Sequence, residues 1–172
     1  MSIEYFQRRQ NILREKIAKE DLDGMLVTNL THIRYLCGFT GSSATLLVTD
    51  NEIYFITDGR YVVQSEKEVK GANIIIDSIP HYEVIKNENL LKNEQKIGFD
   101  GNNVTHQGYQ QISKVLTNQH LVNLTGVIES LAMIKDDKEL EAIKTAVEIT
   151  DKAFAEVLPM VKIGVEEKII AN

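Results

Sequence analysis

The spacing of apolar residues near the start of the chain predicts a helix followed by strands. Over residues 3–20, apolar residues recur at steps of three or four residues or their multiples, which predicts an amphipathic helix. The residues of its apolar face are Ile3, Phe6, Leu13 and Ile17. The short apolar run over residues 24–28 then predicts a buried strand. Segments 44–50 and 52–58 are rich in β-branched and aromatic residues and are separated by a very short polar connection, which predicts a β-hairpin.

The alternation of helices and strands continues through residue 126. The later segments are predicted as helix 60–69, strand 72–77, helix 81–92, strand 96–100, helix 105–116 and strand 121–124. One neighbouring pair of strands is antiparallel in this scheme. We therefore expect an α/β fold, with a mixed, about six-stranded sheet flanked by helices on both faces.

The pattern changes after about residue 130. Asp136 is placed to cap a long helix that runs to about Leu158. Its apolar stripe consists of Leu140, Ile143, Val147, Phe154 and Leu158. Such a broad face must be buried against something, and a further helical pattern after Gly164 continues to Asn172. We expect a first domain over 1–130, with 131–172 forming a linker and the first helices of a second domain in a longer protein.

Composition and charge exclude several classes of protein. With 43% apolar and 26% charged residues in 172, the chain is neither disordered nor a disulfide scaffold. The net charge of −6, and the lack of a basic cluster beyond Arg8-Arg9, argue against nucleic-acid binding. No apolar run is long enough for a membrane span, and the N-terminus lacks the apolar core of a signal peptide. A single cysteine, Cys37, fits a reducing cytoplasm.

No self-contained catalytic motif is present. The sequence lacks a nucleophile elbow, a phosphate-binding loop, a dinucleotide fingerprint and an H-E-x-x-H helix. The four histidines lie in separate segments, so histidine could bind a metal only if the fold brought ligands together. Cys37 is better explained as a small semi-buried residue than as a nucleophile.

Two segments carry the candidate chemistry. In IRYLCGFTGSS, residues 33–43, Gly38 and Gly41 are typical of a tight loop with exposed backbone N–H groups and an aromatic tip at Phe39, or of a plain connection with both glycines at positive φ. In TDGRY, residues 57–61, Asp58 can simply cap the next helix. Alternatively, the guanidinium of Arg60 beside the phenol of Tyr61 can hold a carboxylate or a carbonyl.

These segments, in this order, resemble the N-terminal domain of the creatinase and prolidase family, specifically Xaa-Pro aminopeptidases and dipeptidases. The similar stretches are IRYLCGFTGSSATLLVT at 33–49, IYFITDGRY at 53–61, KIGFDG at 96–101, SLAMIKDDKELEAIKTAVEITDKAF at 130–154 and the closing IGVEEKIIAN. The resemblance covers essentially the whole chain and implies a ribonuclease H-like α/β architecture.

The resemblance also implies a two-domain enzyme that hydrolyses the peptide bond before proline. In that family a C-terminal domain holds two divalent metal ions, often manganese, through two Asp, one His and two Glu. None of those ligands falls within residues 1–172, so the resemblance implies no cofactor and no catalytic residue in this chain, which would be inactive alone. The N-terminal domain of the family serves homodimer or higher homo-oligomer assembly and lends side chains to the rim of an active site.

The rim residues implied for this chain are Phe39, Asp58, Arg60 and Tyr61, as contacts for a proline-containing peptide, with Arg60 the first choice. Two other functions stay open: a catalytically inactive protein-binding module of the same fold, and a creatinase-type amidinohydrolase. Ala132, Ile163 and Cys37 depart from common residues of the family and loosen the subfamily assignment. Aminopeptidase and dipeptidase activity are not separated by these residues.

Overall fold

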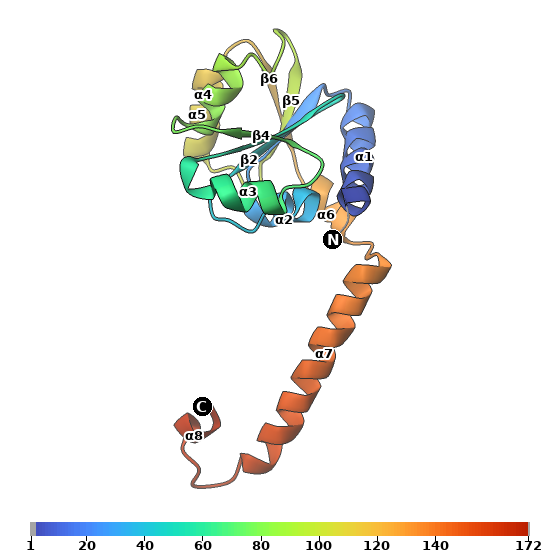
Figure 1. Cartoon of the computed structure of the whole chain (residues 1–172), viewed down its shortest axis with the longest axis vertical. Coiled ribbons are helices and arrows are strands. Elements are labelled where there is room, and N and C mark those ends of the chain that lie inside the picture. The colour runs from blue at the N-terminus through green and yellow to red at the C-terminus, as the bar shows by residue number, and fades with distance from the viewer. Residues whose placement is uncertain (1–2, 172) are drawn as a thin grey trace. The chain divides into compact units, whose positions relative to one another are not determined.

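The computed structural model describes residues 3–171, and the chain divides into two compact units, residues 1–132 and 133–172. The first unit is a six-stranded mixed sheet with helices on both faces (Figure 1), which confirms the expected fold class. Its elements are α1 (Ile3–Lys19), β1 (Gly24–Val27), α2 (Leu30–Cys37), β2 (Thr45–Thr49), β3 (Ile53–Thr57), η1 (Gly59–Tyr61), α3 (Val62–Glu68), β4 (Asn73–Ile76), α4 (His81–Asn87), β5 (Lys96–Asp100), α5 (His106–Val115), β6 (His120–Leu124) and α6 (Val127–Ala132).

The strand order is β4-β3-β2-β1-β5-β6. The hairpin β2/β3 is antiparallel, as the sequence predicts, with Thr45 opposite Ile56. A second antiparallel pair, β1/β2, was not predicted, whereas β3/β4, β1/β5 and β5/β6 are parallel. Every strand except β2 therefore points its carboxyl end toward one edge of the sheet. The amino end of β2 lies at that same edge.

Two apolar layers cover the sheet. One contains buried residues of α1, α2 and α6 together with Phe55, and the other contains buried residues of α4 and α5 together with Ile56. Figure 1 shows α1 and the pair α4/α5 on opposite sides of the strands. Successive side chains of a strand point to opposite faces, so a strand covered on both sides is apolar at nearly every position. Strand β2, with five consecutive buried residues, is the clearest example.

Several local predictions are corrected by the structure. The sequence predicts a loop over segment 33–43, but the first part of this segment belongs to α2. Asn29 caps this helix by accepting hydrogen bonds from the backbone of Thr31 and His32. Helix α6 was not predicted, because six residues are too few to show a helical period. Helix α4 ends at Asn87 rather than 92, and Ile3 is exposed rather than part of the buried face of α1.

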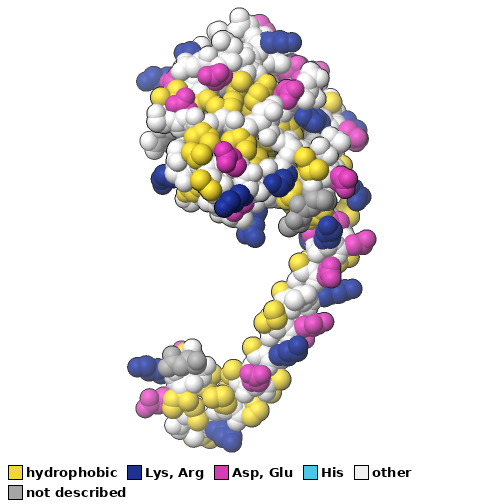
Figure 2. Space-filling model, in the orientation of Figure 1, with side chains coloured by type: hydrophobic (Ala, Val, Ile, Leu, Met, Phe, Trp, Pro, Cys, Tyr) yellow, Lys and Arg dark blue, Asp and Glu magenta, His cyan; other side chains and the backbone are white. Residues whose placement is uncertain are grey.

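The second unit contains α7 (Asp137–Val157), η2 (Leu158–Met160) and α8 (Glu167–Ala171). As predicted, Asp136 is the N-cap of α7, and it forms a capping box with Glu139. The predicted apolar stripe is exposed along the helix, from Leu140 to Leu158, and Figure 2 shows it interleaved with charged side chains. Asn172 lies outside the described residues. Across the described residues, no helix is long and apolar enough to span a membrane.

Candidate functional site

The loop after α2 and the turn after β3 meet at the carboxyl edge of the sheet. Because β2 and β3 are antiparallel, the segment that enters β2 lies beside the segment that leaves β3. The Thr57 hydroxyl, fully buried, donates a hydrogen bond of 2.7 Å to the carbonyl oxygen of Ser43 and fastens the two segments together. The two segments that the sequence singled out therefore form one site.

Asp58 and Arg60 form a bidentate ion pair on this edge. Arg60 Nε donates to Asp58 Oδ1 at 2.8 Å, and Arg60 Nη2 donates to Asp58 Oδ2 at 2.9 Å. Asp58 also accepts a hydrogen bond from the backbone N–H of Arg60, so it caps η1 as predicted. The hydrogen bonds from Arg60 lower the pKa of the Asp58 carboxyl well below its ordinary value, and the Arg60 pKa is raised in turn. The guanidinium is thus held in one orientation although its side chain is 69% exposed.

Part of the guanidinium remains available to a ligand. The paired atoms are Nε and Nη2, and Arg60 Nη1 has no hydrogen-bond partner among the described residues. The guanidinium carbon lies 5.3 Å from the centre of the Tyr61 ring, within the range of a cation–π contact. An exposed, oriented N–H donor beside an aromatic ring is suited to bind a carbonyl or carboxylate oxygen.

Tyr61 is tied to the glycine-containing loop. Its hydroxyl lies 2.6 Å from the hydroxyl of Ser42 and accepts a hydrogen bond from the Ser42 backbone N–H. The hydroxyl contact with Ser42 is the main cause of a lowered Tyr61 pKa. Two residues before Ser42, the Thr40 backbone N–H and hydroxyl both donate to the carboxylate of Glu68 on α3. These bonds fix the loop to the helix that follows η1.

The expected aromatic tip at Phe39 is wrong, because the Phe39 side chain points inward and is only 1% exposed. Its ring packs edge-on against Phe55, with centroids 4.7 Å apart, and against Tyr61, with centroids 5.4 Å apart. The buried Phe39 ring therefore packs against the inner side of the Tyr61 ring and helps to hold it in position. Gly38 has a φ of +90°, which confirms one of the two positive-φ positions considered, whereas Gly41 is not among the residues with positive φ.

Gly41 has a steric role instead. A Cβ atom at this position would lie 2.3 Å from Phe39 Cζ and 2.7 Å from Tyr61 Cε1. The absence of a side chain at Gly41 allows the two rings to approach the loop backbone. Cys37 is fully buried, and desolvation raises the pKa of its thiol to about 12, so the structural interpretation of this residue is confirmed.

A second cluster of ionisable side chains lies on the same edge of the sheet. His32 of α2, Asp100 at the end of β5 and Glu129 of α6 converge there, with one possible metal-ligand atom from each within 4.8 Å of the others. The sequence patterns do not indicate that these three side chains meet. Asp100, a carboxylate at the carboxyl end of a predicted strand, is a signal in the sequence that points to this edge.

Comparisons with known proteins identify the family. Residues 9–134 match the model of the creatinase/prolidase N-terminal domain. The chain is 32% identical over 160 residues to the uncharacterized peptidase YqhT of Bacillus subtilis, covering 93% of this chain and 45% of that protein.

Solved structures agree. An Xaa-Pro dipeptidase from Bacillus anthracis has a TM-score of 0.89 and 28% identity over 96% of this chain and 46% of that one. An aminopeptidase P structure from Streptococcus thermophilus has a TM-score of 0.66 and 34% identity over 74% of this chain and 98% of that one. The chain thus spans less than half the length of the B. subtilis and B. anthracis proteins. Because the family model covers well over half of its residues, the chain belongs to the creatinase/prolidase N-terminal domain family.

Proposed function

We propose that this chain is the non-catalytic, N-terminal part of a metal-dependent Xaa-Pro peptidase, in which it contributes to homo-oligomer assembly and to binding of the peptide at the rim of an active site. Family membership supports this proposal, as do the relatives that are named Xaa-Pro dipeptidase and aminopeptidase. The hydrolytic step and its divalent metal ions, manganese in our expectation, would belong to a domain outside these residues.

The observation that carries the proposal is the oriented Arg60. Asp58 accepts hydrogen bonds from Arg60 Nε and Nη2, which leaves Nη1 available as a donor. We infer that Arg60 Nη1 donates to a carbonyl or carboxylate oxygen of a proline-containing peptide, while Tyr61 contributes its ring face beside the guanidinium. Asp58 then positions Arg60, and the buried Phe39 positions Tyr61. Peptide binding in this scheme needs no reacting group from this chain.

The exposed apolar stripe of α7 also supports a longer protein. Leu140, Val147 and Phe154 are 43%, 51% and 64% exposed, and an apolar surface repeated along a helix is ordinarily buried in the functional molecule. We propose that the domain outside these residues covers that stripe. The same protein would act in the cytoplasm.

Steady-state kinetics of the complete gene product with an Xaa-Pro peptide tests the proposal. We expect Arg60→Ala to raise KM about tenfold or more, the effect of losing a hydrogen bond to a charged group, with kcat and bound metal retained. Arg8→Ala, which removes an exposed arginine on α1, is the matched control and should leave KM unchanged.

Unchanged kinetics in Arg60→Ala would return Arg60 to the ordinary surface residues. A complete protein without hydrolytic activity would instead favour the protein-binding module of the same fold. The oligomeric proposal has its own readout: light scattering of the complete protein should give the mass of a dimer or a larger assembly, and a monomer would contradict it.

A further inference from the structure

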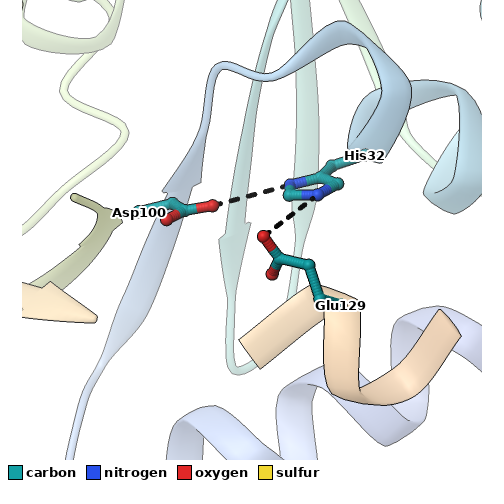
Figure 3. Close-up of side chains that lie close together, drawn as sticks. All are labelled: His32, Asp100 and Glu129. Carbon is teal, nitrogen blue, oxygen red and sulfur yellow. Dashed lines mark ion pairs between the residues drawn. The ribbon is translucent and has the colours of Figure 1, made fainter. Parts of the chain in front are cut away.

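Three ionisable side chains from distant parts of the chain converge at the carboxyl edge of the sheet. His32 lies in the first turn of α2, Asp100 is the last residue of β5, and Glu129 lies in α6. Figure 3 shows the imidazole of His32 between the two carboxylates. His32 Nδ1 is 3.7 Å from Asp100 Oδ2, and His32 Nε2 is 3.6 Å from Glu129 Oε1.

Polar atoms of this cluster lack hydrogen-bond partners. Both His32–carboxylate distances are too long for hydrogen bonds. Among the described residues, His32 Nδ1 and Glu129 Oε2 are buried without a hydrogen-bond partner. Buried polar atoms nearly always have a hydrogen-bond partner, so two atoms without one in the same cluster point to a ligand that satisfies them. Two carboxylates and an imidazole nitrogen would be satisfied by a cation.

Asp100 is already held in place by its neighbours. Its Oδ1 accepts a hydrogen bond of 3.0 Å from the backbone N–H of Asn102, and its Oδ2 accepts one from the Asn103 side chain. The amide of Asn29 donates to the Asn103 side chain, and Asn29 also caps α2 through the backbone N–H of His32. This chain of bonds links the backbone of His32 to the carboxylate of Asp100, as the supporting shell of a metal site does.

The cluster also lies where the topology places a ligand site. The connections that follow the parallel neighbours β1 and β5 lead to opposite faces of the sheet, because α2 packs on one face and α5 on the other. Ligands of open α/β sheets bind in the crevice at such a switch point. His32 lies in the helix that follows β1, and Asp100 is the last residue of β5.

We propose that His32, Asp100 and Glu129 bind one divalent transition-metal ion of the zinc type. One imidazole nitrogen and two carboxylates suit zinc, whereas magnesium and calcium prefer oxygen ligands alone. Ligand atoms about 2.1 Å from a shared ion lie at most about 4.2 Å apart, so the His32–Asp100 gap already fits. The Glu129 side chain is 44% exposed and lies beside Nε2, so the proposed site requires it to turn toward an ion bound between Nδ1 and Asp100. This site is independent of the proposed peptidase function.

Titration calorimetry of the 172-residue chain with zinc chloride, after treatment with a chelator, tests the site. We expect one saturable zinc per chain and a melting temperature that rises with zinc concentration. His32→Gln and Glu129→Gln should each weaken zinc binding about tenfold or more. Asp100 is not used, because its carboxylate also fixes the turn that follows β5.

His120→Gln is the matched control, because it removes the histidine of the exposed His120–Glu94 pair and leaves the cluster intact. Circular dichroism checks that each variant is folded, and Glu129→Gln, on a half-exposed side chain, is the variant that least disturbs packing. The absence of zinc binding, or zinc binding that is lost in His120→Gln but kept in His32→Gln, would overturn the proposal.

Discussion

Gly41 is the position where a single added methyl group most directly tests the described packing. In Gly41→Ala the new Cβ would lie 2.3 Å from Phe39 Cζ, which is more than an ångström inside ordinary contact. Phe39 cannot move freely, because it is 1% exposed and packed against Phe55. Overpacking of this kind costs about 1–3 kcal/mol. The Tyr61 ring, 2.7 Å from the same point, would also be displaced.

Urea unfolding followed by far-ultraviolet circular dichroism measures this cost. With a slope of about 2 kcal/mol per molar urea, we expect the midpoint to fall by about 0.5–1.5 M with the slope unchanged. Gly59→Ala is the matched control, because a Cβ there meets no atom within 4 Å and Gly59 has no positive φ. Its free energy of unfolding should change by less than about 1 kcal/mol. Equal midpoints for the two variants would refute the described packing around Gly41.

Three further predictions follow from single side chains. Cys37 should not react with a thiol reagent at pH 8 in the native chain, but should react fully in guanidinium. Because the pKa of the Cys37 thiol is raised to about 12 in the folded state, its contribution to stability is complete below the unfolded pKa near pH 9, and above pH 9 about 1.4 kcal/mol is lost per pH unit up to pH 12. Cys37→Ala should abolish this loss in urea unfolding measured across that pH range. Arg60→Ala should let the Asp58 carboxyl titrate nearer its ordinary pKa in carbon NMR, since Arg60 is the main cause of the lowered value, and an unchanged titration would contradict the ion pair. Asp136→Ala removes the capping box of α7 and should cost about 1 kcal/mol of helix stability, seen as lost ellipticity at the helix band on heating.

The meeting of the two candidate segments was implicit in the sequence. A hairpin over 44–58 places the residues before its first strand beside those after its second, and both the antiparallel register and the Thr57–Ser43 hydrogen bond follow from it. The inward direction of Phe39 could not be predicted in the same way. The direction of the Phe39 side chain depends on its ring contact with Phe55 and on the absence of a side chain at Gly41. Both are tertiary contacts that leave no pattern in the sequence.

The His32–Asp100–Glu129 cluster was beyond prediction from the sequence for a different reason. Its members are brought together by the parallel pairing of β1 with β5, whose strands lie about 70 residues apart, and by the short helix α6. Neither a strand order nor a six-residue helix leaves a periodic signal in the sequence. From the sequence alone, histidine could bind a metal only if the fold brought ligands together.

Our central proposal is that Arg60 and Tyr61 bind the peptide substrate of a peptidase whose catalytic groups lie outside residues 1–172. The most direct measurement is release of the N-terminal residue from an Xaa-Pro peptide with added manganese, comparing the complete gene product, its Arg60→Ala variant and residues 1–172 alone. We expect activity in the complete protein, a raised KM in the variant and no hydrolysis by residues 1–172. Hydrolysis by residues 1–172 alone, or a complete protein that cleaves no such peptide, would contradict the claim.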